Sequence, residues 1–239
     1  MKKLMCELIH KNKIAEMLVS NYDFRTIVFS GLSFAGGIGL AIFNIVVYGI
    51  TKSLWCGTMA FYHIALVSLR GYVLFSYYKA KKKDVLSEDE QSLLEMKRYR
   101  LCGIVFISLT LCLVAMIAHI VRGDKVFDYE MYVTYTVAGF TLYQMVVAVV
   151  NYIKARSRDS YTVRALRCIN LTTALVSFIS LQAIALDTFS KNVNIPLGNS
   201  ITGFVVCGLI VAIGVYMIVH STLKIKVFKT KAENIMQRS

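Results

Sequence analysis

The sequence contains a single proline, Pro196, and only 17% of its residues are charged, whereas 56% are hydrophobic. Proline is the residue that most often interrupts a helix, so its near absence leaves long helices unbroken. A soluble domain of 239 residues would need many more charged residues at its surface. These shortages argue against an ordinary soluble domain and indicate helices that lie in a membrane.

Motifs for several kinds of chemistry are missing as well. The sequence has no His-Glu-x-x-His, no Gly-x-Ser-x-Gly and no Cys-x-x-Cys, and its four histidines fall in different segments. The six cysteines show no paired spacing, and most lie in apolar stretches, where cysteine behaves as a small apolar residue. We therefore expect no metal site, no cofactor and no disulfide framework, and the sequence favours a protein that is not an enzyme.

Long apolar windows take the place of these features. They occur at about 26–50, 54–78, 101–121, 131–153, 168–189 and 201–222, and each can cross a hydrocarbon core roughly 30 Å thick as a helix. The sequence thus predicts an all-α, polytopic membrane protein with six transmembrane helices. Its parts are an interfacial amphipathic segment (1–24), the transmembrane domain (25–226) and a basic tail (227–239).

The charged residues are distributed unevenly between the two ends of these windows. The formal net charge of +13 would suggest nucleic-acid binding in a soluble protein. Here, only Lys52, Arg122, Lys125 and Lys191 fall on one side, and apart from Arg70 the other lysines and arginines fall on the opposite side. Cytoplasmic loops of membrane proteins collect cations. We therefore expect a plasma or cytoplasmic membrane protein with both termini in the cytoplasm, anionic headgroups at that face, and no nucleic-acid partner.

Arg70 lies inside the second apolar window. A cation near the middle of a bilayer costs about 2.5 to 3.5 kcal/mol on insertion scales, so an intramembrane arginine is a candidate functional residue. His63 and Tyr77 lie seven residues on either side and project toward roughly the same helix face. No window carries Asp or Glu near its middle, so neutral groups, water or an anionic ligand must satisfy the guanidinium. Arg70 either organises the bundle or forms the cationic wall of a polar cavity.

The fourth and fifth windows carry stripes of amide and hydroxyl side chains. Gln144 and Asn151 are seven residues apart on the fourth window, as are Asn170 and Ser177 on the fifth. Lipid disfavours such groups, so both stripes are expected to face the bundle. The resulting candidate substrate-binding set is His63, Arg70, Gln144, Asn151, Asn170, Ser177 and Gln182.

Two further patterns bear on packing. Gly31, Ala35 and Gly39 recur every four residues in the first window, which predicts a close contact with another helix. Basic residues recur at the inner ends of the second, fourth and sixth windows. This recurrence fits three helical hairpins, although the distribution of cations across a membrane explains it equally well.

The leading hypothesis is a permease or transporter-like protein that binds a small, anionic solute at Arg70 and at the amides of the fourth and fifth windows. The alternative is a non-transporting membrane subunit or sensor that docks a protein partner through its cytoplasmic loops. Association with a second copy of the chain also stays open, and no motif identifies the solute.

Overall fold

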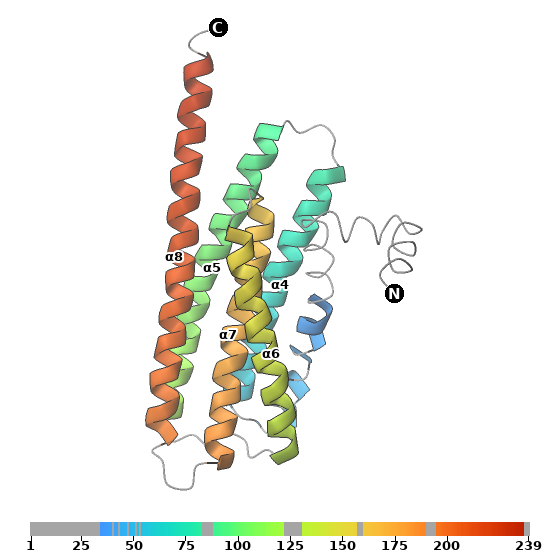
Figure 1. The fold of residues 1–239 in the computed structure, drawn as a ribbon, viewed down its shortest axis with the longest axis vertical. Helices are drawn as coiled ribbons and strands as arrows, with labels where there is room; N and C mark the ends of the chain where they lie inside the picture. Colours follow the sequence, from blue (N-terminus) through green and yellow to red (C-terminus); the bar gives the residue numbers. More distant parts are fainter. Residues whose placement is uncertain are drawn as a thin grey trace, which may run out of the picture.

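A computed structural model of the chain describes residues 34–39, 41–42, 44–46, 48–50, 52, 54–82, 88–121, 131–156, 160–189 and 195–236. These residues include apolar helical residues within Phe34–Ile50 and five long helices, shown in Figure 1. The long helices are α4 (Leu54–Lys82), α5 (Glu88–Val121), α6 (Met131–Arg156), α7 (Tyr161–Phe189) and α8 (Ile195–Met236). The predicted amphipathic segment 1–24 lies outside the described residues.

Four of these helices are long and apolar enough to cross a membrane. Their apolar parts are Gly57–Ala80, Asp89–Ala115, Tyr161–Gln182 and Ser200–Phe228. The helix α6 has 26 residues, which at 1.5 Å per residue is about 39 Å of helix. The structure therefore supports the predicted class of helical membrane proteins, with four candidate spans.

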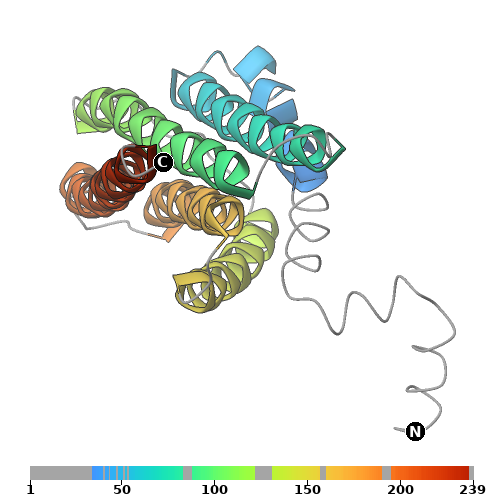
Figure 2. The same ribbon diagram turned by 90° about the horizontal axis from the view of Figure 1, so that it is seen from above.

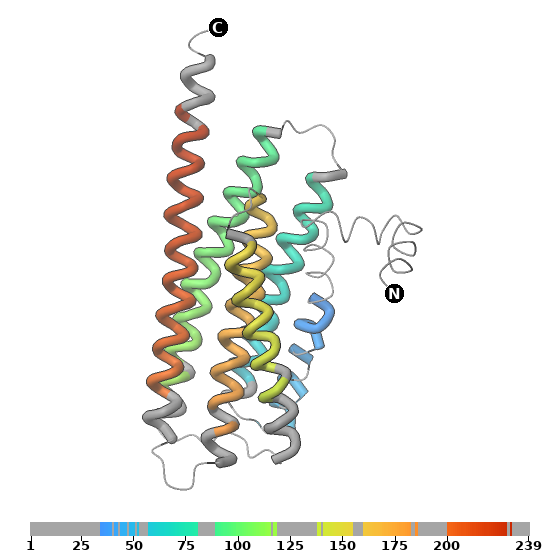
Figure 3. The backbone as a smooth tube through the Cα atoms, in the orientation of Figure 1, coloured from blue at the N-terminus to red at the C-terminus, as the bar shows by residue number. Residues whose placement is uncertain are grey.

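The helix α7 is the centre of the bundle. Successive long helices run in alternating directions, α4, α6 and α8 one way and α5 and α7 the other (Figure 3). Figure 2 shows the other four long helices placed around α7, and each of them contacts it. The membrane window of α7 is also the most buried of the four, at 72%. Residues on α7 can therefore meet side chains from every neighbouring long helix.

The closest helix packing joins α5 to α8 through two glycines. A Cβ atom on Gly103 would lie 2.7 Å from the carbonyl oxygen of Gly214, and a Cβ atom on Gly214 would lie 2.9 Å from the carbonyl oxygen of Gly103. Side chains at these positions would force the two backbones apart. Such backbone approach is a main source of helix association in lipid, where no hydrophobic force draws helices together.

Only some of the helices pair as the arrangement of three hairpins implies. Consecutive helices α5 and α6 make no contact within their described residues, because α7 lies between them (Figure 2). The helix α7 does pack against α8, and the first helical residues pack against α4, where Phe34 faces Gly71 and Gly37 faces Val67. The two arms of the middle hairpin are therefore not neighbours, and the packing gives the repeat hypothesis no support.

The predicted small-residue contact of the first window is wrong for Gly39. Ala35 and Gly39 are exposed, and a Cβ atom on Gly39 would meet no atom of the described residues within 4 Å. Gly37 and Ala41 are buried instead, and a Cβ atom on Gly37 would lie 2.8 Å from Cγ2 of Val67. Positions two residues apart on a helix point in nearly opposite directions. The window carries two small-residue stripes, and the one that contains Gly37 packs; Gly31 lies outside the described residues.

Candidate functional site

Arg70 lies near the middle of α4, and its side chain is only 3% exposed. Its Nη2 donates a hydrogen bond to Oγ1 of Thr173 on α7, with 3.4 Å between the two atoms. The hydroxyl of Thr173 in turn donates to the carbonyl oxygen of Ile169 at 2.8 Å. Because that bond uses the hydroxyl proton, the oxygen can present a lone pair to the guanidinium. Thr173 is therefore oriented as an acceptor for Arg70.

A second surface borders the same guanidinium. A Cβ atom on Gly37 would lie 3.8 Å from Nη1 of Arg70. The two terminal nitrogens therefore reach different elements, Nη1 toward the helical residues that precede α4 and Nη2 toward α7. Arg70 consequently lies where three segments of the bundle meet.

Contacts farther along α4 fix how it lies on α7. Oγ of Ser180 is 3.4 Å from Sδ of Met59. Compared with the bond between Arg70 and Thr173, this contact is nearer the start of α4 and nearer the end of α7. The two helices are thus antiparallel, and Ser177 falls between the two contacts on α7. His63 also falls between them, on α4, and it is 4% exposed. Its Nδ1 is 2.8 Å from the carbonyl oxygen of Met59 in its own helix, which occupies that nitrogen.

The helix α6 brings an amide to the level of Arg70. The helices α6 and α7 are antiparallel and contact one another. Gln144 is as far from the end of α6 as Thr173 is from the start of α7, so the two residues lie at the same level. Three side-chain oxygens in this region are buried without a hydrogen-bond partner among the described atoms: Oε1 of Gln144, Oδ1 of Asn170 and Oγ1 of Thr172. Leaving such atoms unsatisfied is costly in an apolar interior. Water or a ligand with hydrogen-bond donors would satisfy them.

The predicted set is therefore only partly gathered. Arg70, Gln144 and Asn170 lie at similar depth, with Ser177 about two turns beyond Asn170 on α7. Asn151 is seven residues from Gln144, about 10 Å along the axis of α6, and Gln182 is nine residues from Thr173, about 14 Å along α7. These two residues belong to other levels of the bundle, and His63 bonds within its own helix.

The predicted substrate-binding set leaves out three residues that the structure places in or near this region. Thr173 contacts Arg70 directly, and Thr172 is fully buried. Thr173 shares a helix face with Asn170 and Ser177, so the same spacing argument would have included it. Arg167 is only 6% exposed, although its position before the fifth apolar window had placed it in a cytoplasmic loop. The reason is that α7 begins at Tyr161, ahead of the apolar window.

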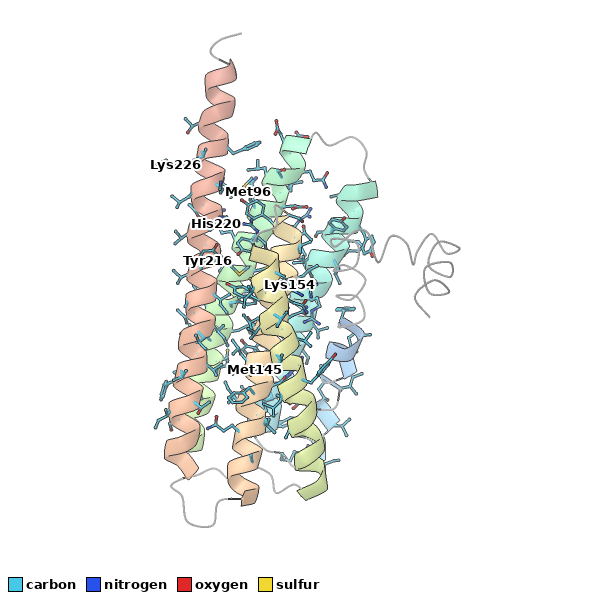
Figure 4. The ribbon with its side chains drawn as sticks, in the orientation of Figure 1. Met96, Met145, Lys154, Tyr216, His220 and Lys226 are labelled. Atoms are coloured by element: carbon cyan, nitrogen blue, oxygen red, sulfur yellow. The ribbon has the colours of Figure 1, made fainter. Side chains whose placement is uncertain are left out.

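A second polar group joins α5, α7 and α8 at the end of the bundle where α7 begins. We call it the ring cluster, and it consists of Tyr99, Tyr161, Tyr216 and His220. The ring centroids of Tyr161 lie 5.8 Å from Tyr99 and 5.9 Å from His220, and the His220 ring stacks on Tyr216 at 5.6 Å. Figure 4 labels Tyr216 and His220 on α8.

One carboxylate anchors this end of α7. Oε2 of Glu95, on α5, accepts hydrogen bonds from the backbone N–H groups of Tyr161, at 3.1 Å, and Thr162, at 3.4 Å. The first amides of a helix have no partner in the helix itself, and the helix dipole favours negative charge there. Glu95 therefore ties the start of α7 to α5.

Metal ligation has no structural support in the part of the chain that the structure describes, where no group of three or more His, Cys, Asp or Glu side chains could hold an ion. Comparison of the chain with protein-family models, with curated proteins and with solved structures finds no match.

Proposed function

We propose that this chain is a six-span permease or transporter-like protein of a plasma or cytoplasmic membrane, with its solute site at Arg70, Thr173 and Gln144. The solute is a small anion that also carries hydrogen-bond donors. Its negative group would contact the guanidinium, and its donors would reach the buried oxygens of Gln144 and Asn170. Solute sites near the bilayer midplane, between discontinuous or polar helices, are common among transporters.

The observation that carries the proposal is a buried cation that donates a hydrogen bond to a neutral hydroxyl. Arg70 is 3% exposed, and its bond to Thr173 reaches a neutral hydroxyl. Two further amide oxygens and one hydroxyl oxygen in this region are buried without a hydrogen-bond partner among the described atoms. Intramembrane charges of this kind usually mark solute or ion pathways. A donor-bearing anion matches both halves of the site.

The six-span topology is part of the same proposal. The long helices α4 to α8 run in alternating directions, as successive membrane crossings do (Figure 3). The helix α6 is long enough to serve as a further span. The first span would be the first apolar window, 26–50, in which the described residues within Phe34–Ile50 are apolar and helical. With six spans, both termini lie on one side, and the distribution of lysine and arginine assigns that side to the cytoplasm.

Uptake into vesicles tests the proposal. The purified chain is reconstituted into vesicles, and labelled phosphate, short hydroxy acids and amino acids, which all carry hydrogen-bond donors, are added outside in turn. We expect uptake of at least one of these anions, partial retention in Arg70→Lys because the cation remains, and loss in Arg70→Gln. An Arg70→Gln variant that transports as well as the parent would overturn the site.

Threonine variants supply a matched control. Thr173 and Thr110 are both buried, and each hydroxyl donates to a carbonyl oxygen of its own helix at 2.8 Å. Only Thr173 also accepts the bond that Arg70 donates through Nη2. Thr173→Val should therefore weaken uptake several-fold, while Thr110→Val should not. Equal effects would mean that the hydroxyl of Thr173 does not serve the solute.

Stability measurements separate the two classes of function. If Arg70 organises the bundle, Arg70→Gln should melt far below the parent, because its partners lose fixed donors. That result, with no uptake of any tested anion and co-purification of a protein, would favour the alternative of a partner-docking membrane subunit.

A further inference from the structure

A buried histidine lies on the same face of α4 as Arg70. His63 precedes Arg70 by nearly two helical turns, or about 10 Å along the helix axis. Its side chain is 4% exposed and lies within the apolar part of α4, Gly57–Ala80. Histidine changes its charge near neutral pH, and ionisable groups inside membrane spans often carry protons. His63 therefore has both the position and the chemistry of a proton site.

The hydrogen bond of His63 determines which ring nitrogen can take up a proton. Nδ1 lies 2.8 Å from the carbonyl oxygen of Met59, and a carbonyl oxygen can only accept a hydrogen bond. Nδ1 therefore carries the proton of the neutral ring, and the lone pair is on Nε2. A proton added to Nε2 leaves the bond to Met59 intact. Met59 is itself held in place, because it is 1% exposed and its Sδ lies 3.4 Å from Oγ of Ser180 on α7.

The segments that pack against this part of α4 carry no acidic or basic side chain except histidine. The first helical residues contact α4 on both sides of His63, and residues 38–47 between those contacts include no ionisable side chain. On α7, residues 174–179 lie between the two contacts with α4, and none of them is ionisable. The other ionisable residues of α4 before Arg70 and of the apolar part of α5 are Cys56, Tyr62, Cys102, Cys112 and His119. Arg70 is therefore the one permanent charge in these segments.

The charge of Arg70 links the proton on His63 to the solute. A proton on His63 would place two cations on one face of α4, and like charges repel each other. A negative group bound at Arg70 would offset that repulsion. Binding of the anion and binding of the proton then favour each other, and thermodynamic linkage makes the effect reciprocal.

We propose that His63 binds the proton that enters with each anion, so that uptake at the Arg70 site is coupled to protons. This inference rests on the permease function proposed above. A proton from the outer water adds to Nε2 of His63, and the anion binds at Arg70. Both are then released to the cytoplasm, where Nε2 returns its proton to water. With a singly charged anion the pair carries no net charge across the membrane, and both side chains return to their starting state.

Uptake under a proton gradient tests the parent protein first. Vesicles that contain the full chain are held at about pH 7.5 inside, and labelled phosphate, glycerate or serine is added outside at about pH 7.5 or about pH 5.5. The protonated fraction of an ordinary histidine differs about tenfold between these two values. We expect acid outside to raise the initial rate of uptake several-fold, and a pH-sensitive dye inside the vesicles to report acidification as the anion enters.

His63→Asn separates the proton from the fold. Its amide N–H can still donate to the carbonyl oxygen of Met59, but the side chain cannot bind a second proton. It should lose the effect of acid outside and keep the exchange of labelled for unlabelled anion at equal pH, because exchange moves no net proton. His220→Gln is the matched control, since His220 is the other histidine whose side chain the structure describes, and it should keep the effect. Comparing variants at the same pH cancels any change in the charge of the anion itself.

The outcomes distinguish this inference from the permease function. Uptake by the parent that does not respond to acid outside would overturn the coupling alone, as would a His63→Asn variant that keeps the full effect. No uptake of any of these anions at either pH would overturn both. If His63→Asn also loses exchange, His63→Gln replaces it, because its longer side chain places the amide nearer the position of Nε2.

Discussion

The contact between Gly103 of α5 and Gly214 of α8 gives the sharpest test of the helix arrangement. In Gly103→Ala the new methyl group would sit 2.7 Å from a backbone oxygen, with Cγ1 of Ile218 at 3.0 Å and Cβ of Met217 at 3.1 Å. An oxygen of the backbone cannot rotate away as a flexible side chain can. The two helices must therefore separate by several tenths of an ångström along their closest contact.

The size of the effect follows from comparison with Gly208 of α8. A Cβ atom on Gly208 would meet nothing within 4 Å, and Gly208 is exposed. Both alanine variants gain the same helix propensity, up to about 1 kcal/mol. This gain cancels when the two variants are compared, which leaves the cost of overpacking, typically about 1 to 3 kcal/mol. We therefore expect Gly103→Ala to be less stable than Gly208→Ala by that amount.

Unfolding in mixed detergent micelles, followed by circular dichroism, measures this difference. Gly214→Ala should behave like Gly103→Ala, because its methyl group would lie 2.9 Å from the carbonyl oxygen of Gly103. The double variant should cost less than the sum of the two single changes, since one separation of the helices serves both methyl groups. Equal stability of Gly103→Ala and Gly208→Ala would show that α5 and α8 do not approach each other closely.

Three further predictions use the same preparations. Gly37→Leu should destabilise the protein by about 1 to 3 kcal/mol, whereas Gly39→Leu should change the stability by less than about 0.5 kcal/mol. The reverse order would show that the stripe that contains Gly39 makes the contact. Glu95→Ala should cost about 1 kcal/mol, as the loss of a helix cap does, and Glu95→Gln should cost less because its amide oxygen still accepts; equal costs would exclude the cap. A membrane-impermeant thiol reagent added from outside should label cysteines placed between Val121 and Glu130 and spare those between Lys81 and Arg98, and the opposite pattern would invert the topology.

The helices were predictable from the sequence, but their ends were not. Hydropathy located each described long helix, since the residues that cross hydrocarbon must be apolar. It placed the sixth window at 201–222, whereas α8 continues to Met236, and it started the third window at 101, whereas α5 begins at Glu88. Helical hydrogen bonding does not stop where the hydrocarbon stops. A hydropathy window therefore measures the apolar part of a helix and misses charged turns such as the one that carries Arg167.

The partners of the helices were much less predictable. Small residues at four-residue spacing mark a face that can pack, but the first window has two such faces, and only the three-dimensional arrangement shows that Gly37 packs. The contact of α5 with α8 was likewise hidden, because Gly103 and Gly214 are far apart in the sequence. For the site, periodicity placed Gln144 and Asn170 on inward faces, but only the register between helices puts them at the level of Arg70.

The length of the bond between Arg70 and Thr173 bears on which role Arg70 has. Charge-assisted hydrogen bonds between nitrogen and oxygen are usually about 2.7 to 2.9 Å long, and this one is 3.4 Å. A bond that long contributes little to the packing of α4 on α7. Thr173→Val should therefore lower the stability no more than Thr110→Val does, since both lose the same bond to their own helix. If so, any loss of uptake that is confined to Thr173→Val reports on the solute site alone, and a larger loss of stability in Thr173→Val would instead make the contact part of the scaffold.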